Sequence, residues 1–402
     1  MMQLFKEAGY DIVEYEDIAD IYVVNTCTVT NMSDRKSRQI LRRAKELNPN
    51  SILCVVGCYV QVAKEELSNF TEIDILLGTN DRKNIVKFVK EFEKEKLVVV
   101  NEIMKKQEYL EWNGTAYTNH ERAEIKIQDG CDRFCTYCII PYARGPVRSR
   151  KIDDIVDETK KLADSGIKEI VVTGIHISSY GKDLKEDISL IDVLERINDI
   201  DKIQRIRLGS LEPIIITEEF VSRLKNLKKI CNHFHLSLQS GCNETLKRMN
   251  RRYATEDFKT IVKLLRDNIN DVALTTDVIV GFPGETEEEF NQTVNFLNEV
   301  KFSKMHVFKY SPRKGTKAAS FPNQIDGKIK SKRSDILIKM SEKNEKEFAS
   351  RYIGTSIEVL FENESEGHTT NYIKVVDKSS TRVAAEISDV EPKGYEKDYL
   401  FI

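Results

Sequence analysis

Residues 130–138 read GCDRFCTYC and place Cys131, Cys135 and Cys138 within one short segment, directly after the strand-like run 124–128. Thiols without a shared role are normally scattered along a chain, so the Cys-x3-Cys-x2-Cys spacing predicts a metal-containing group. Thiolates favour iron-sulfur clusters or zinc, and a four-iron cluster held by three cysteines keeps one iron open for a substrate. The segment therefore predicts a cluster-binding loop at the end of a strand.

Structural zinc is the alternative interpretation of this loop. A structural zinc ion takes four ligands, usually cysteine and histidine. The histidines that flank the loop are His120, on the side of an expected linker, and His176. The spacing thus favours the iron-sulfur cluster over zinc.

Six strand-like runs separated by helical patterns form the middle of the chain. The runs cover residues 124–128, 169–173, 204–208, 235–239, 274–280 and 304–310. A capping box, Thr286 with Glu289, precedes one of the helical patterns. Alternating strands and helices predict a parallel barrel, and six units instead of eight predict a partial (βα)6 barrel. In such a barrel the chemistry lies at the carboxyl ends of the strands.

Both flanks of this barrel have patterns of their own. Apolar runs at 21–24, 52–56, 73–77 and 97–100 alternate with amphipathic patterns at 33–47 and 80–93, which predicts a small parallel α/β domain. A long helical pattern at 326–352 is followed by β-type runs at 356–361, 369–376 and 383–387, which predict a small β-barrel. We therefore expect an α/β protein with a first domain at 1–105, a linker at 106–122 that holds Trp112, the barrel domain at 123–350 and a β-barrel at 351–402.

Composition excludes several classes of protein. The chain has 402 residues, 62 Lys plus Arg against 65 Asp plus Glu and a net charge of -3, so it has no general attraction to nucleic acid or to membranes. No segment approaches the roughly 18 apolar residues of a membrane span, and the first residues lack the apolar core of a signal peptide. Eight cysteines are too few for a disulfide scaffold of this length. We expect a cytoplasmic protein without a membrane partner.

Several motifs together resemble one enzyme family. Cys131, Cys135 and Cys138 after a barrel strand resemble the radical S-adenosylmethionine (SAM) superfamily, and residues 140–150, IPYARGPVRSR, narrow the resemblance to the methylthiotransferases. Further matching segments are NTCTVT at 25–30, DRKSRQ at 34–39, GCY at 57–59, SLQSGC at 237–242 and DVIVGFPGET at 277–286. The segments at 25–30 and 34–39 resemble the branch that acts on threonylcarbamoyladenosine in transfer RNA.

The resemblance implies a three-part enzyme: an amino-terminal domain with an auxiliary [4Fe-4S] cluster, a radical SAM partial barrel and a carboxyl-terminal TRAM β-barrel. In that family the open iron of the first cluster chelates SAM, and reductive cleavage yields a radical that removes a hydrogen atom. A methylthio group is then delivered to C2 of N6-threonylcarbamoyladenosine at position 37 of the tRNA anticodon loop. The resemblance also implies an electron donor such as flavodoxin or ferredoxin.

The resemblance assigns auxiliary-cluster ligands to Cys27 and Cys58, which follow their strands as loop ligands should. The family normally carries a further ligand in an earlier Gly-Cys-x-x-Asn segment, so we expect the auxiliary site to be one thiolate short and the chain to be truncated at its amino terminus. Cys54 is a conceivable substitute, but a cysteine inside an apolar strand is more typical of a small buried hydrophobe. For Cys231 and Cys242 we expect structural roles.

Candidate SAM contacts lie near the expected strand ends. Thr173 and Gly174 end the second barrel strand, where the superfamily meets the SAM amino group, although a turn glycine explains Gly174 equally well. Ser237 and Gln239 alternate on the expected fourth strand and would share one face, toward the barrel interior. The remaining candidates are Gly281, which could admit adenine close to the backbone, and Tyr137.

A basic segment at 301–318 predicts an RNA path, because it contains six basic residues and no acid, together with Phe308 and Tyr310. Basic side chains would meet phosphates while the aromatic rings stack on unpaired bases. The candidate RNA-binding residues are Arg144, Arg148, Lys309, Tyr310, Arg313 and Lys314. A solvated charged face is the plainer interpretation, and residues 352–402 carry a net charge of -5 from ten acids and five bases.

Two other functions stay open at this point. One is the same chemistry on another modified adenosine or on a ribosomal-protein side chain. The other is a zinc-bearing RNA-binding module without catalysis, which the six βα units disfavour because such barrels usually house enzymes.

Overall fold

A computed structural model describes residues 1–105, 108–111 and 122–402. The chain folds into two units. Of the described residues, the first contains 1–105, 108–111, 129–148 and 311–320, and the second contains 122–128, 149–310 and 321–402. Trp112 and most of the expected linker lie outside the described residues. The domain boundaries drawn from the sequence stay a prediction.

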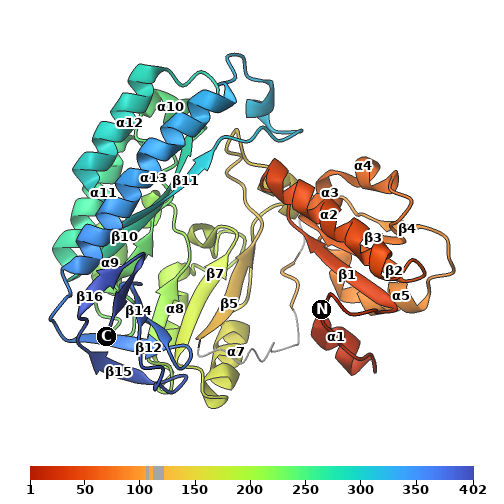
Figure 1. Ribbon diagram of the computed structural model, residues 1–402, viewed down its shortest axis with the longest axis horizontal. Coiled ribbons are helices and arrows are strands. Elements are labelled where there is room, and N and C mark those ends of the chain that lie inside the picture. The colour runs from red at the N-terminus through yellow and green to blue at the C-terminus, as the bar shows by residue number, and fades with distance from the viewer. Residues whose placement is uncertain (106–107, 112–121) are drawn as a thin grey trace. The chain divides into compact units, whose positions relative to one another are not determined.

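The first unit is built on a four-stranded parallel sheet in the order β1-β2-β3-β4 (Figure 1). Its elements are α1 (Met2–Glu7), β1 (Ile21–Thr26), α2 (Asn31–Leu47), β2 (Ile52–Gly57), α3 (Cys58–Val62), α4 (Lys64–Ser68), β3 (Ile75–Leu77), η1 (Asp81–Asn84), α5 (Ile85–Lys90), β4 (Leu97–Val99) and α6 (Ile140–Arg144). Alternate strand residues pack on opposite faces: Leu53 and Val55 belong to one apolar core, and Cys54 and Val56 to another. The predicted parallel α/β domain is confirmed.

The second unit contains the barrel strands and their helices. Its elements up to the last barrel strand are β5 (Arg122–Asp129), β6 (Arg148–Ser149), α7 (Ile152–Asp164), β7 (Glu169–Gly174), η2 (Ile177–Ser179), α8 (Leu190–Asn198), β8 (Arg205–Leu208), η3 (Pro213–Ile215), α9 (Glu218–Leu224), β9 (His233–His235), α10 (Asn243–Arg248), α11 (Thr255–Asn268), β10 (Ala273–Val280), α12 (Glu287–Val300) and β11 (Lys304–Lys309). They are followed by η4 (Lys317–Ser320), which belongs to the first unit, and by α13 (Gly327–Ser350).

The barrel strands form two sheets, in the orders β6-β5-β7-β8 and β9-β10-β11. A parallel bridge between Ile206 and Ile230 connects β8 to the segment ahead of β9. Helices α11, α12 and α13 lie along one side of the second sheet (Figure 1), and one large apolar core joins strands and helices. Strands β5, β7, β8, β9, β10 and β11 occupy the six predicted strand positions, so the predicted α/β partial barrel is confirmed.

The fourth barrel strand is displaced from its predicted position. It covers His233–His235 instead of 235–239. Gln239 has a left-handed backbone, with φ of 71°, which interrupts regular pairing. Beyond His235 the chain follows its neighbours only through isolated bridges at Leu236 and Gln239.

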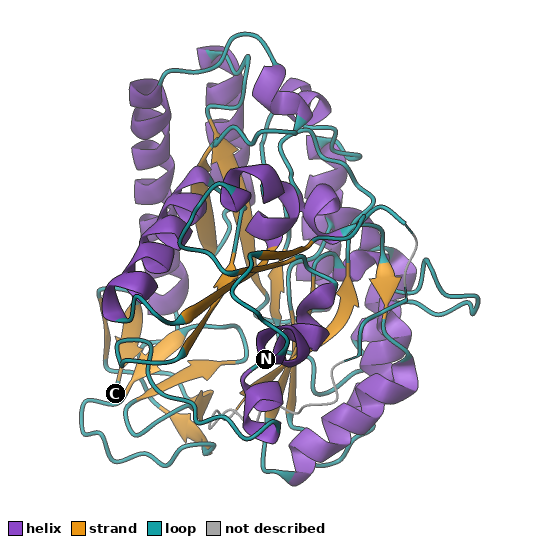
Figure 2. Ribbon diagram, turned by 90° about the vertical axis from the view of Figure 1, so that its right-hand side faces the viewer, coloured by secondary structure: helices purple, strands orange, loops and turns teal. Residues whose placement is uncertain are grey.

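The carboxyl-terminal region is β-rich and belongs to the second unit. Its strands are β12 (Ile357–Phe361), β13 (Glu366–Thr369), β14 (Lys374–Val376), β15 (Ile387–Val390), β16 (Gly394–Glu396) and β17 (Tyr399–Phe401), in the sheet order β15-β12-β13-β14-β17-β16. The strand predicted at 383–387 was wrong, since it begins only at Ile387, after Ala385 with its left-handed φ of 64°. The sequence pattern missed β16 and β17, which end the chain near the C label in Figure 2.

Two buried arginines of β8 fasten this region to the barrel strands. Arg205 donates to the His368 carbonyl at 2.9 Å, and Arg207 donates to the Thr370 carbonyl at 3.0 Å. Arg207 also pairs with Glu169 of β7 at 2.7 Å. Buried ionic groups that lack partners are costly, so these contacts favour one fixed arrangement of the β-rich region on the barrel.

No helix in the described part of the chain combines the length and the apolar character needed to cross a bilayer.

Candidate active site

The loop that carries Cys131, Cys135 and Cys138 follows β5 and is shaped by its backbone. The three cysteines are partly buried. The Cys131 N–H donates to the Gly145 carbonyl at 3.0 Å, and the Cys138 N–H donates to the Cys135 carbonyl at 2.9 Å. At Gly130, where φ is 75°, a Cβ would lie 1.8 Å from the Pro146 carbonyl oxygen. Only glycine fits there, so the turn that starts the loop is fixed by sequence.

Cys27 and Cys58 are brought together by strand pairing. Thr26, the last residue of β1, is in register with Gly57, the last residue of β2. The two cysteines follow these paired residues directly, Cys27 exposed and Cys58 buried at the start of α3. The carboxyl edge of a parallel sheet is where ligands collect, because loops from adjacent strands meet there.

A guanidinium group contacts one of these two cysteines. Arg144 ends α6, the short helix that begins at Ile140 just after Cys138, and its Nε donates to the Cys58 Sγ at 3.1 Å. Burial disfavours the charged guanidinium, but the neighbouring Cys58 and Asp129 nevertheless raise the pKa of Arg144 above its usual value. Helix α6 thus links the three-cysteine loop to the edge that carries Cys27 and Cys58.

Arg82, Arg144, Arg148 and the carboxylate of Asp129 lie near Cys58, and the Asp34 carboxylate accepts from Thr28, next to Cys27. Asp129 lies 3.5 Å from Arg144 and 3.4 Å from Arg148. Burial and the neighbouring Arg144 lower the pKa of Arg82, which is also close to Cys58. Within the described residues, the Nε of Arg148 is buried without a hydrogen-bond partner. Several buried guanidinium groups repel one another, so their arrangement is unfavourable unless an anionic group lies among them.

This charge pattern fits an iron-sulfur cluster. A cluster with its thiolates is anionic, and hydrogen bonds to its sulfur atoms tune it. Zinc fits less well, since no group of three histidine, cysteine or acidic residues in the described ranges is placed to hold a single metal ion. In a four-iron cluster each cysteine binds a different iron, so the thiolates need not converge on one point.

The other cysteines behave as structural residues. Cys54, Cys231 and Cys242 are buried. Burial raises the pKa of Cys54 to about 12, and that of Cys231 to about 12 as well. Cys54 faces the core that contains Phe5, Ile75 and Ile85, which agrees with the interpretation of this residue as a small hydrophobe.

The predicted SAM contacts occupy different environments. Thr173 and Gly174 end β7, and a Cβ on Gly174 would lie 2.9 Å from the Gln128 carbonyl oxygen, so packing alone explains this glycine. Gly281, with φ of 70°, is covered by the stem of Lys330, whose Cγ would lie 2.3 Å from an added Cβ. Ser237 and Gln239 were expected to share one face of a regular strand. That expectation was wrong, because β9 ends at His235 and Gln239 has a left-handed backbone. Tyr137 is partly buried on the cysteine loop.

A partly buried polar network that the sequence patterns did not indicate lies beyond the ends of β7 and β8. His176 Nε2 lies 3.0 Å from the Glu212 carboxylate, and His176 Nδ1 lies 2.7 Å from the Ser179 hydroxyl. Glu212 is 3% exposed and also lies 3.7 Å from Arg251. Ligands of α/β barrels bind at the carboxyl ends of the strands, and burial of a charged group there is costly without a partner. The buried Glu212 therefore indicates a ligand-binding site at this end of the barrel. The signal in the sequence was a histidine and a glutamate placed just after two apolar runs.

The predicted RNA residues divide into two groups. Lys309 and Lys314 are exposed, as an RNA path requires. Tyr310 is buried, with its ring against Phe282 at 5.3 Å, and so is not available to stack on a base. This part of the prediction was wrong because the aromatic ring faces the core.

The three predicted RNA-binding arginines also make internal contacts. Arg148 and Arg313 are buried, the former beside Asp129 and the latter 2.6 Å from Asp34. Arg144 contacts Cys58, as described above. These internal contacts in the first unit compete with phosphate contact, and RNA binding by the three arginines stays a prediction.

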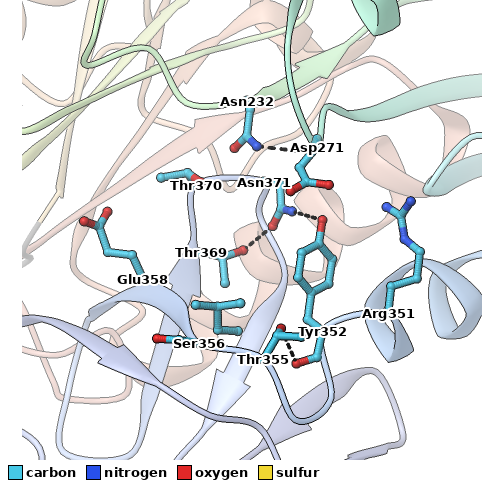
Figure 3. A pocket seen from close by; sticks show the side chains of 11 residues that line it. Asn232, Asp271, Arg351, Tyr352, Thr355, Ser356, Glu358, Thr369, Thr370 and Asn371 are labelled. Atoms are coloured by element: carbon cyan, nitrogen blue, oxygen red, sulfur yellow. Dashed lines mark hydrogen bonds between the residues drawn. The ribbon is translucent and has the colours of Figure 1, made fainter.

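A polar pocket of about 430 Å³ lies at the opposite end of the barrel strands (Figure 3). Asn232 and Asp271, which precede β9 and β10, line it together with residues of the β-rich region. Asn371 Nδ2 donates to the Tyr352 hydroxyl at 2.7 Å across it. Because the amino ends of barrel strands serve stability more than chemistry, we assign this pocket to the contact between barrel and β-rich region.

Comparison with known proteins gives two family matches along the chain. Residues 125–297 match the radical SAM superfamily, and residues 1–78 match the uncharacterized protein family UPF0004. The structure resembles that of the radical S-adenosylmethionine methyltransferase TsrM from Kitasatospora setae, with a TM-score of 0.60 and 15% identity over 79% of this chain and 72% of that one. At this identity the likeness supports the fold alone.

Three relatives share much more sequence. The chain is 43% identical to the threonylcarbamoyladenosine tRNA methylthiotransferase MtaB of Bacillus subtilis, over 97% of this chain and 89% of the relative. It is 40% identical to the protein of the same name from Aquifex aeolicus, over 92% and 90%. It is 38% identical to a tRNA-2-methylthio-N6-dimethylallyladenosine synthase of Thermoanaerobacter, over 89% and 78%.

Proposed function

Because the chain belongs to the radical SAM methylthiotransferase family, we propose that it adds a methylthio group to C2 of N6-threonylcarbamoyladenosine at position 37 of tRNA. The observation that carries the proposal is the pair of cysteine sites in one unit, linked by α6 and its Arg144–Cys58 contact. One cluster is needed to cleave SAM and a second to supply sulfur, and this arrangement provides three cysteines for the first and two for the second. The choice of nucleoside rests on the names of the two most similar relatives described above.

In this proposal Cys131, Cys135 and Cys138 hold the SAM-cleaving [4Fe-4S] cluster, and Cys27 and Cys58 contribute to the auxiliary cluster. When bound, the clusters supply the electron for reductive cleavage of SAM and the site where the methylthio group is assembled. The chain's own part is to position these groups. Gly130 sets the turn of the first loop, and Arg144 holds the Cys58 sulfur by a charge-assisted hydrogen bond.

The auxiliary site contains two cysteines with the required environment, and a cluster held by three thiolates needs one more ligand. Burial of Cys54 in the core on β2 favours a ligand other than Cys54. Iron and acid-labile sulfide per chain after anaerobic reconstitution test this point. About eight irons support both clusters, with Cys54 or an outside ligand completing the auxiliary site, and about four support the three-cysteine loop alone.

SAM itself would lie at the carboxyl ends of the barrel strands, near Thr173 and the network of His176 and Glu212. Buried polar groups at this end suit the polar amino-acid and ribose parts of SAM. Ser237, Gln239, Gly281 and Tyr137 stay candidate SAM contacts on the same proposal. This placement is tested by measuring the affinity for SAM of the Glu212→Gln variant. We expect the variant to bind SAM more weakly than the parent.

For RNA, the proposal keeps the exposed Lys309 and Lys314 as phosphate contacts. The anticodon loop is the expected partner, with flavodoxin or ferredoxin as electron donor and the cytoplasm as the location. Nucleoside mass spectrometry of tRNA from cells that lack the gene tests the substrate. Loss of the methylthio form of threonylcarbamoyladenosine supports the proposal, and an unchanged level overturns it. Loss of the methylthio form of dimethylallyladenosine instead would assign the chain to the other branch.

A further inference from the structure

The inner face of the sheet β9-β10-β11 carries a row of polar side chains. Strand register places Asp277 beside His306 and Ile279 beside Phe308, with Thr275 between His235 and Lys304. The alternate residues Leu274, Val278 and Met305 belong to the apolar core with the helices. Side chains of successive strand residues point to opposite faces, so the polar row faces away from that core, toward the barrel interior.

These side chains are held in place by one another. The Thr275 hydroxyl lies 3.0 Å from His233 Nε2 and 3.1 Å from His235 Nδ1. His235 Nε2 lies 3.4 Å from the Asp277 carboxylate, and its ring lies 5.7 Å from that of His306. Within the described ranges, no side-chain hydrogen bond joins Asp277 or His306 to another residue. A carboxylate and an imidazole therefore sit side by side with free acceptor and donor capacity.

An exposed aromatic ring completes the row. Phe308 is 48% exposed although it lies on a barrel strand, one step along the same face from His306. Strand β11 is the outer strand of its sheet, and the next residue, Lys309, is exposed. The ring of Phe308, the carboxylate of Asp277 and the imidazole of His306 thus lie on the same face, at the accessible edge of the barrel interior.

Two of the proposed SAM residues, Thr173 and Gly174, lie at a different depth from this face, whereas Gln239 lies beside it and donates its backbone N–H to the Asp277 carbonyl at 2.9 Å. Asp277 and His306 each lie three residues before the end of their strands, at Val280 and Lys309. At roughly 3.3 Å per residue, this places them about 10 Å below the strand ends. The SAM candidates Thr173 and Gly174 lie at a strand end.

We propose that this inner face binds the target adenine of the RNA, with Phe308 stacked on the base, Asp277 accepting from the exocyclic N–H and His306 donating to a ring nitrogen. Adenine presents a donor next to an acceptor along one edge, whereas guanine presents two acceptors, which the carboxylate would repel. The inference rests on the proposed function, because it assumes that an adenosine of RNA is the substrate. It names the residues that select and orient that base.

The test compares variants of the full-length, reconstituted protein on an anticodon stem-loop RNA with threonylcarbamoyladenosine. Asp277→Leu removes the acceptor while keeping a similar shape, and Phe308→Ala removes the ring. Each should lower kcat/KM for methylthio transfer about tenfold or more, as expected for a lost charged hydrogen bond or a lost stacking contact. Phe308→Trp keeps a stacking surface and should stay within about threefold of the parent. Asp277→Asn keeps one acceptor oxygen and should fall between the parent and Asp277→Leu.

Two further measurements make the outcome specific. Affinity for SAM alone should not change in Asp277→Leu or Phe308→Ala, and Lys343→Gln, on the exposed side of α13, should match the parent in every assay. Weakened SAM binding would assign the face to the adenine of SAM and overturn the proposal, as would transfer at the parent's rate in both variants. If the parent itself modifies a different adenosine, the proposed function fails, and the same variants assayed on that RNA still decide the role of this face.

Discussion

The two sets of cysteines come together in different ways. Cys131, Cys135 and Cys138 lie on one short loop, whose shape depends on Gly130 and on backbone hydrogen bonds within residues 131–145. Cys27 and Cys58 are far apart in sequence and meet because β1 and β2 pair in parallel with Thr26 opposite Gly57. The first set is a local structure, whereas the second depends on the fold of a whole sheet.

Their electrostatic surroundings differ as well. Arg82, Arg144 and Arg148 gather beside Cys58 with one carboxylate, Asp129, between them. This concentration of positive charge would stabilise an anionic group at the sheet edge, and Arg144 donates directly to the Cys58 sulfur. The auxiliary site proposed at Cys27 and Cys58 would therefore depend on residues well outside its cysteine motif, including helix α6, which follows the other cysteine loop.

The largest effect is expected at the three-cysteine loop. Cys135→Ala removes a ligand that no neighbouring residue can replace, so SAM cleavage should fall by about a thousandfold or more and iron by about four per chain. The measurements are 5′-deoxyadenosine formation with a chemical reductant and iron content. Cys231→Ala, a change at a buried cysteine elsewhere, is the control and should keep both. SAM cleavage near the parent's rate in Cys135→Ala would contradict the assignment of this loop.

Cys58→Ser should separate the two sites. Methylthio transfer should fall below detection, because the auxiliary cluster loses a thiolate, while 5′-deoxyadenosine formation without RNA stays within about threefold of the parent. The iron content should fall by the four atoms of the auxiliary cluster, to about four per chain less than in the parent. A parent protein that binds only about four irons, with no change in Cys58→Ser, would show that this edge holds no cluster.

The same contrast explains how much was predictable from sequence. The cysteine loop and the barrel strands were predictable because spacing and apolar periodicity are local properties. The position of Cys58 beside Arg144 was not, because sequence shows Arg144 only as a cation, and a cation in a basic motif suggests phosphate. Tyr310 was misplaced for a similar reason, since a pattern of aromatic and basic residues does not reveal which ring packs on Phe282.

Local backbone conformation accounts for the errors in strand position. Gln239 and Ala385 adopt left-handed conformations, with φ of 71° and 64°, that no periodicity of apolar residues signals. The first shortens β9, and the second delays the start of β15. The internal partners of Arg313, Asp34 among them, also depend on contacts between segments far apart in the sequence.

Arg144→Gln should give an intermediate effect. The variant loses the charge-assisted hydrogen bond to Cys58, and contacts of this kind typically change metal affinity or activity tenfold to a hundredfold. We expect methylthio transfer to fall about tenfold, with a shift in the midpoint potential of the auxiliary cluster measured by EPR-monitored titration. Arg144→Lys should recover part of the transfer rate. A potential and an EPR spectrum identical to the parent's would limit Arg144 to packing.

The smallest effect is expected at Cys54, the cysteine on β2 that faces the core. Burial raises its pKa to about 12, so less than one thiol in a thousand is ionised at pH 8 and the residue should resist alkylation by iodoacetamide in the folded protein. Cys54→Val keeps an apolar side chain of similar size and should change the free energy of unfolding by about 1 kcal/mol or less, with iron content unchanged. Loss of iron in Cys54→Val would instead make Cys54 the additional auxiliary ligand and would require β2 to open at that residue.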